Sequence, residues 1–261
     1  AIIPVHFAGL ACDMDKIIEL ARKYNLKVIE DAAHAFPTRY KDKLIGTLDT
    51  DATVFSFYAN KTMTTAEGGM LVSKDPKIIL RCKVMRLHGI SRDAFDRYQS
   101  TTPAWYYEIV DNGCKYNTTD INASLGLVQL KKQELLKQKR EIIAAKYNEG
   151  FTNNVNICLP FVKDDRETAW HLYVIKVKNR DLIIDKLKEN GVGCSVHFIP
   201  VHKHPYYKDK FGYKNENYPV SNNVFEKSLS LFLLMLDILP FHIFPSKIVF
   251  IFSIFSSSLK L

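Results

Sequence analysis

Residues 29–35 read Ile29-Glu30-Asp31-Ala32-Ala33-His34-Ala35. Lys27–Glu30 is predicted to form a short strand, and the polar side chains of Asp31 and His34 follow its carboxyl end. In open α/β sheets, ligands bind beside the carboxyl ends of the parallel strands. We therefore expect Asp31 and His34 to border a binding site.

The residues before this stretch predict a strand, a helix and a second strand. Ala1–His6 is an apolar run typical of a buried strand. Asp13 is placed to cap a helix whose apolar residues share one face. That face comprises Met14, Ile17, Ile18, Leu20 and Ala21. A βαβ unit of about 30 residues implies a parallel sheet with covered faces, so we predict an α/β fold.

A second polar block follows the next predicted strand. Residues 55–70 read FSFYANKTMTTAEGGM and begin within the strand candidate Asp51–Tyr58. Gly68–Ser73 is predicted to be another strand. The pair Asp75-Pro76 then opens a helix, with a capping carboxylate and proline at the first helical position.

These two blocks contain the side chains that an amine-transferring site needs. Lys61 offers an amine that forms a Schiff base with an aldehyde cofactor and then carries protons. Asp31 offers a carboxylate for a cofactor's pyridine nitrogen, and Ser56 offers a hydroxyl for a phosphate. Each residue alone also has an ordinary explanation: a surface lysine, a helix-capping aspartate and a core hydroxyl. The spacing by itself leaves both explanations open.

The rest of the chain predicts a long helix and a second, smaller unit. Thr119 begins the helix, which continues to about Asn148 with an apolar stripe. That stripe comprises Leu125, Val128, Leu135 and Ile142. Beyond it, strands are predicted at Ala169–Val177 and Val192–Ile199, with a helix at Asp181–Asn190 between them. We predict a partial large domain, a small domain and an apolar, atypical tail over residues 1–149, 150–230 and 231–261.

Composition excludes several classes of protein. The 261 residues are 47% hydrophobic and 25% charged, which is typical of a soluble globular protein. The net charge of +8 favours anionic partners or a solvated basic exterior, but no nucleic-acid-binding signature accompanies it. The five scattered cysteines argue against a disulfide framework or a zinc site and for a reducing, cytoplasmic location. The apolar runs of the tail are shorter than the ~20 residues of a membrane-spanning helix.

Taken together, the ordered segments resemble the DegT/DnrJ/EryC1/StrS family of nucleotide-sugar aminotransferases, which use pyridoxal 5′-phosphate (PLP). The resemblance extends from Ala1 to about Leu231 and implies the aspartate-aminotransferase fold. It is carried by Ala1–Asp15, EDAAHA at 30–35, FSFYA-x-K at 55–61, KYNTTDI at 115–121, SVHFIPVH at 195–202 and HPYY at 204–207.

The resemblance also implies roles for individual residues. Lys61 would form the Schiff base with PLP, and Asp31 would pair with the pyridine nitrogen. His34 would lie against the cofactor ring, and Ser56 would bind the phosphate. Each of these roles is an expectation that comes from the family pattern.

Two further residues and three departures follow from the same resemblance. Asn117 would reach the cofactor phosphate of a neighbouring subunit, which implies a homodimer with shared sites. His197 lies in a segment that would face the sugar, although a core or rim histidine is an equal alternative. Asn60, Ala66 and Cys114 stand where the family commonly has threonine, glycine and an aromatic residue. If the backbone at Ala66 has a positive φ, alanine is strained there and glycine is not.

The activity implied by the family is transfer of an amino group, with glutamate as donor, to a keto group of a nucleotide-linked sugar. A PLP-dependent sugar dehydratase is an alternative, which Lys61 opposes because that branch carries histidine at this position. The other alternative is an inactive remnant. It is motivated by the lack of an equivalent for the family's amino-terminal half-domain and by the apolar tail. For the tail, a membrane anchor is one interpretation, and a departure from the natural reading frame is the preferred one.

Overall fold

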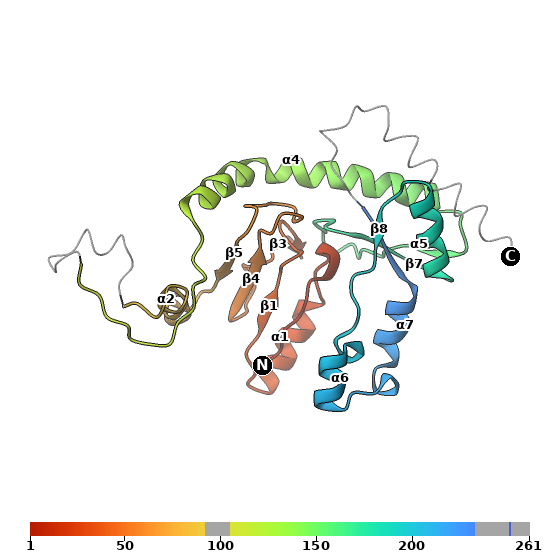
Figure 1. Ribbon diagram of the computed structural model, residues 1–261. Coiled ribbons are helices and arrows are strands. Elements are labelled where there is room, and N and C mark those ends of the chain that lie inside the picture. Colours follow the sequence, from red (N-terminus) through yellow and green to blue (C-terminus); the bar gives the residue numbers. More distant parts are fainter. Residues whose placement is uncertain (92–104, 233–250, 252–261) are drawn as a thin grey trace. The chain divides into compact units, whose positions relative to one another are not determined.

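The computed structural model describes residues 1–91, 105–232 and 251, which belong to two compact units. The first unit contains residues 1–136 and 164–169, and the second contains the remaining described residues from 137 onward. The two units divide inside the long helix α4 (Asp120–Phe151) (Figure 1). The proposed domain limits at residues 149 and 230 stay a prediction.

The first unit is built on a sheet with the strand order β1-β4-β5. These strands are β1 (Ile29–Asp31), β4 (Ala52–Ser56) and β5 (Gly69–Val72). β1 and β4 are parallel, whereas β4 and β5 are antiparallel, so the sheet is mixed (Figure 1). A short hairpin of β2 (Arg39–Tyr40) and β3 (Lys43–Leu44) accompanies it.

The segment at residues 1–6 runs parallel to β1, as two isolated bridges show. Ile2 pairs with Val28, and Val5 pairs with Asp31. The prediction of a buried strand is wrong, because the pairing is limited to isolated bridges and the side chains alternate between a buried and an exposed face. His6 is fully buried, whereas Ile3 is 63% exposed and Val5 is 49% exposed.

Helix α1 (Met14–Lys23) follows the predicted span, but its predicted cap is wrong. Asp13 occupies the N-cap position without a side-chain capping hydrogen bond. Its Oδ1 instead accepts from Nη2 of Arg166 at 2.7 Å. The guanidinium carries a full positive charge, whereas a backbone N–H carries only a partial one, so Arg166 competes with the helix terminus for this carboxylate. Met14 and Ala21 pack into the core of the first unit.

Helix α2 (Pro76–Met85) begins as predicted. Oδ1 of Asp75 accepts the Lys77 amide N–H at 2.8 Å, and Pro76 occupies the first turn. The orphan amide at the start of the helix is therefore satisfied by a residue two positions before it.

The predicted apolar stripe of α4 is not part of the core. Leu125, Val128, Leu135 and Ile142 are 48%, 52%, 53% and 58% exposed. The helix buries a different face, which carries Ala144, Tyr147 and Phe151 within the second unit. Helical spacing correctly predicted the helix, but its longest apolar stripe faces solvent.

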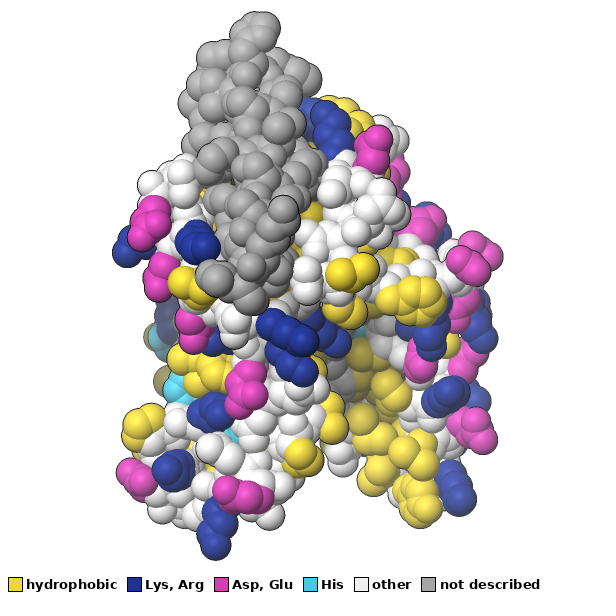
Figure 2. Space-filling model, turned by 90° about the vertical axis from the view of Figure 1, so that its right-hand side faces the viewer, with side chains coloured by type: hydrophobic (Ala, Val, Ile, Leu, Met, Phe, Trp, Pro, Cys, Tyr) yellow, Lys and Arg dark blue, Asp and Glu magenta, His cyan; other side chains and the backbone are white. Residues whose placement is uncertain are grey.

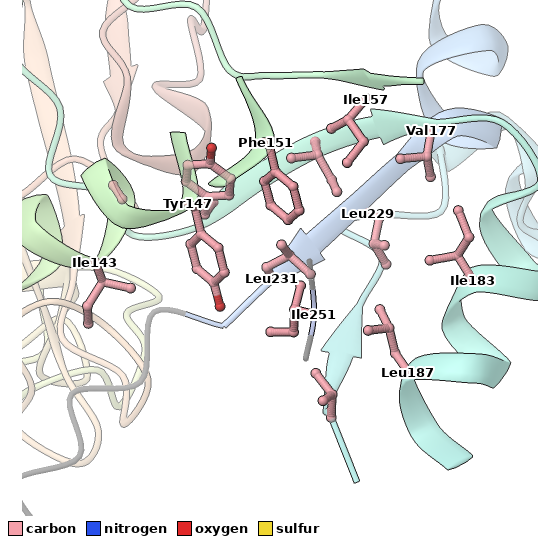
Figure 3. Close-up of a cluster of buried hydrophobic side chains, with 14 residues drawn as sticks. Ile143, Tyr147, Phe151, Ile157, Val177, Ile183, Leu187, Leu229, Leu231 and Ile251 are labelled. Atoms are coloured by element: carbon pink, nitrogen blue, oxygen red, sulfur yellow. The ribbon is translucent and has the colours of Figure 1, made fainter. Parts of the chain in front are cut away.

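The second unit is an antiparallel sheet with the order β6-β7-β9-β8, flanked by helices. Its strands are β6 (Ile157–Cys158), β7 (Tyr173–Val177), β8 (Cys194–Ser195) and β9 (Ser228–Leu231). Its helices are α5 (Arg180–Glu189), α6 (Pro205–Phe211) and α7 (Pro219–Lys227). Figure 3 shows how side chains from α4, α5 and the sheet converge on one core.

Only part of the predicted tail lies in the described residues. Leu231 is the last residue of β9 and is 1% exposed, and Ile251 joins the same core at 4% exposure. The apolar run at 248–255 otherwise lies outside the described residues. Within the described part of the chain, no helix is both long and apolar enough to cross a bilayer.

Basic and acidic side chains are interspersed on the face drawn in Figure 2, and hydrophobic side chains gather there in several patches. A mixture of both signs is the pattern of a solvated exterior.

Candidate active site

Asp31 and Ser56 end two neighbouring parallel strands. Asp31 is the last residue of β1, and its register partner in β4 is Val54. Ser56 lies two residues further along β4, at its carboxyl end. Because side chains alternate along a strand, Val54 and Ser56 point to the same face as Asp31. Both polar side chains are half-buried at one edge of the sheet.

Lys61 lies in the connection between β4 and β5, where its amide N–H donates to the Tyr58 carbonyl at 3.0 Å. Partial burial lowers the pKa of the Lys61 amine, and the nearby Asp31 carboxylate opposes that shift by raising it. Burial outweighs the carboxylate, so the pKa of Lys61 is lowered overall. The Asp31 carboxylate therefore acts on the Lys61 amine, although the two residues are 30 positions apart in the chain.

The Asp31 carboxylate also has a local partner. Its Oδ1 accepts the Ala33 amide N–H at 3.1 Å, which is the geometry of an Asx-turn. Main-chain bonds hold Asp31 on both sides: its amide donates to the Pro4 carbonyl at 2.9 Å, and its carbonyl accepts from the His6 amide at 3.0 Å.

His34 is held from a neighbouring turn at residues 7–9. The Ala8 amide N–H donates to Nδ1 of His34 at 3.3 Å. The Phe7 ring lies 5.9 Å from the His34 ring, centroid to centroid, at a tilt of 52°. Because Nδ1 accepts this bond, the proton of the neutral imidazole lies on Nε2.

The loop that carries Lys61 is closed by main-chain bonds around Phe57. The Phe57 amide donates to the Gly68 carbonyl, and its carbonyl accepts from the Thr65 amide, both at 2.9 Å. Within this loop Ala66 has a φ of 66°, in the left-handed region. The strain expected if alanine replaces glycine there is therefore present.

Asn117 lies on the approach to α4. Its Oδ1 accepts a hydrogen bond from Nζ of Lys115, and its Nδ2 donates to the Thr118 carbonyl at 3.3 Å. Its expected part in a neighbouring subunit's site stays a prediction.

His197 belongs to the second unit. Its Nδ1 lies 2.9 Å from Oγ of Ser230 in β9, and its ring meets the Phe198 ring edge-on at 4.8 Å. Its expected role beside the sugar stays a prediction.

Sequence reasoning missed two buried residues beside this site. His6 and Glu30 are fully buried and share a hydrogen bond of 2.9 Å between Nε2 and Oε2. Glu30 is an ionisable residue within an apolar strand, and such residues are almost never fully buried without a partner. The sequence could therefore have predicted a partner for Glu30, but not that the partner is His6.

This chain is similar to known proteins in both sequence and structure. Residues 1–235 match the model of the DegT/DnrJ/EryC1/StrS aminotransferase family. The chain is 50% identical over 237 residues to the uncharacterized protein MJ1066 of Methanocaldococcus jannaschii and 46% identical over 238 residues to the spore coat polysaccharide biosynthesis protein SpsC of Bacillus subtilis. Each match covers 88% of this chain and 61% of the relative.

A solved structure is similar over nearly the whole chain. It is the PMP form of Spr1654 from Streptococcus pneumoniae, assigned as a sugar aminotransferase, with a TM-score of 0.86 and 31% identity. The match covers 98% of this chain and 69% of that one, and the same protein is also solved in a PLP form. The chain therefore belongs to the DegT/DnrJ/EryC1/StrS aminotransferase family, and the predicted fold is confirmed.

The chemistry of the described residues fits PLP, the cofactor of this family. Lys61 is half-buried and its pKa is lowered, which favours the neutral amine that bonds to the aldehyde of PLP. Asp31 offers a carboxylate for the pyridine nitrogen. The Ser56 hydroxyl lies at the same strand edge and supplies a donor for a phosphate. These three residues would hold the cofactor.

Proposed function

We propose that this protein is a PLP-dependent aminotransferase that transfers an amino group, with glutamate as donor, to a keto group of a nucleotide-linked sugar. The observation that carries the proposal is the placement of Asp31 and Ser56 at the carboxyl ends of two neighbouring parallel strands, with the half-buried Lys61 in the connection that follows Ser56. The chain spans 61% of the length of its two curated relatives, so the activity of the whole protein belongs to the proposal.

Each residue has one chemical task in this proposal. Bound PLP supplies an electron sink for the carbon that gains or loses a proton. The lowered pKa of Lys61 increases the neutral fraction of its amine, which bonds to an aldehyde and later carries a proton. Asp31 keeps a pyridine nitrogen protonated, Ser56 donates to a phosphate and His34 lies against the ring.

The substrate class rests on the relatives. SpsC is a polysaccharide biosynthesis protein and Spr1654 is assigned as a sugar aminotransferase, which supports a sugar as amino acceptor. The net charge of +8 is favourable for a nucleotide's phosphates. The proposal includes a cytoplasmic homodimer in which Asn117 reaches the partner's cofactor and His197 faces the sugar.

The first test is a titration of the chain with PLP, followed by the visible absorbance of lysine-bound PLP. We expect a saturable band in the wild type and none in Lys61→Ala. Lys77→Ala, which removes an exposed lysine elsewhere, is the matched control and should bind as the wild type does. A folded wild-type sample without the band would identify this chain as an inactive remnant of the family.

The second test measures amino transfer from glutamate to a nucleotide-linked keto sugar. The expected product carries a new amine on the sugar, formed with 2-oxoglutarate. A deoxygenated sugar without amino transfer would instead support the dehydratase.

A further inference from the structure

The His6–Glu30 pair lies on the opposite face of β1 from Asp31 and is not used by the proposed chemistry. Both oxygens of Glu30 are occupied: Oε2 by Nε2 of His6 at 2.9 Å, and Oε1 by the hydroxyls of Thr50 and Thr53, each at 2.7 Å. Thr53 belongs to β4, whose carboxyl end carries Ser56. The buried carboxylate thus ties together the two strands that end at the candidate site.

The second ring nitrogen of His6 binds the turn that follows it. Nδ1 accepts the Cys12 amide N–H at 3.1 Å, and the His6 carbonyl accepts the Gly9 amide N–H at 3.3 Å. With Nδ1 accepting, the ring proton lies on Nε2 and is donated to Glu30. His6 therefore closes the turn at residues 7–12 with one ring nitrogen and anchors it to β1 with the other.

The same turn carries the group that contacts His34. Ala8 lies in it with a φ of 60°, and its amide N–H donates to Nδ1 of His34. A left-handed alanine persists only where its surroundings hold it, because the conformation costs about 1–2 kcal/mol. The bonds that the Gly9 and Cys12 amides donate to His6 span Ala8 and restrain the turn that contains it.

We propose that His6 is a positioning residue of the candidate site: by closing the turn at residues 7–12, it directs the Ala8 amide to Nδ1 of His34 and so keeps the His34 proton on Nε2. The expected effect of His6 on PLP binding rests on the proposed function, in which His34 lies against the cofactor ring. The tautomer itself does not depend on any cofactor.

Two variants of His6 separate positioning from stability. His6→Gln places an amide nitrogen near the position of Nε2, which keeps a donor for Glu30 and removes the acceptor for Cys12. His6→Asn places an amide oxygen near Nδ1, which keeps the acceptor for Cys12 and removes the donor for Glu30. Leu48→Ala removes packing from the same core without touching this network and is the stability control.

The measurement is the ¹⁵N NMR spectrum of the histidine rings in the cofactor-free chain, with the His34 signals identified from His34→Gln. We expect an unprotonated Nδ1 and a protonated Nε2 for His34 in the wild type, in His6→Asn and in Leu48→Ala. In His6→Gln we expect a mixture of tautomers. A wild-type His34 with its proton on Nδ1, or an unchanged tautomer in His6→Gln, would overturn the proposal.

A PLP titration of the same variants adds a second readout. His6→Gln should bind PLP roughly tenfold more weakly than Leu48→Ala does. If the wild type binds no PLP, the proposed function fails, while the tautomer measurement still decides the role of His6.

Discussion

The carboxylate of Glu30 and the imidazole of His6 form a fully buried pair, joined over 2.9 Å between Oε2 and Nε2. Glu30 adjoins Asp31 in β1, so the pair lies directly behind the residue expected to partner PLP. A buried charge with its hydrogen-bond partners in place is tolerated, whereas removing one partner typically costs about 3–5 kcal/mol.

Glu30 should make the protein sensitive to acid. Burial alone would raise the pKa of Glu30, but hydrogen bonds from His6, Thr50 and Thr53 outweigh it, so the pKa falls below the ordinary 4.5. A lowered folded-state pKa contributes stability that is complete above the unfolded value and lost as pH falls through the folded value. We expect the free energy of unfolding, from urea titrations, to fall below about pH 4.5 and this fall to be smaller in Glu30→Gln. An identical pH dependence in both proteins would contradict this.

Asp31 should control the basicity of Lys61. The carboxylate favours the charged ammonium, so Asp31→Asn should lower the pKa of Lys61 further below its ordinary value. The midpoint of pH-dependent labelling of Lys61 by an amine-reactive reagent, read by peptide mass spectrometry, should move to lower pH. Ser56→Ala removes a neutral hydroxyl and should leave the midpoint in place. An upward movement in Asp31→Asn would show that the two groups are not coupled as described.

Replacing Ala66 with glycine should stabilise the protein. At a φ of 66° the methyl group of alanine is strained, and glycine relieves about 1 kcal/mol of that strain. The matched control is Ala123→Gly inside α4, where the same change should destabilise by about 1 kcal/mol. Urea unfolding of both variants measures the two signs, and a destabilised Ala66→Gly would contradict the left-handed geometry.

The exposed stripe of α4 should tolerate polar residues. Leu125 and Leu135 are 48% and 53% exposed, so Leu125→Gln and Leu135→Gln should each change the free energy of unfolding by no more than about 0.5 kcal/mol. Phe151→Ala, at a site only 1% exposed, should cost about 3–5 kcal/mol. Chemical denaturation compares the three variants, and a large loss at Leu125 or Leu135 would show that the stripe is buried.

Local features of the sequence were predicted well where neighbouring residues determine them. The cap of α2 by Asp75, the strand at β4 and the extent of α5 all depend on groups a few positions apart. The placement of Asp31 and Ser56 at strand ends could likewise be predicted. Helix periodicity, capping and turn formation depend on residues a few positions apart, so the sequence alone is enough to predict these elements.

The partners of several side chains could not be predicted in this way. Asp13 has the ideal position for a cap, yet it binds Arg166, which lies 153 positions later. The α4 stripe has regular spacing, yet it is exposed. Spacing shows that one helix face is apolar but not which face another element covers.

The sequence alone determined the family, the alternation of strands and helices, and the identity of Lys61, Asp31, His34 and Ser56 as candidate site residues. Only the tertiary structure decided that Asp31 acts on Lys61, that His6 is buried against Glu30 and that Ala66 adopts a left-handed backbone. The physical reason is that helix and turn hydrogen bonds form between near neighbours, whereas strand pairing and the environment of a side chain are set by residues that the fold brings from distant positions.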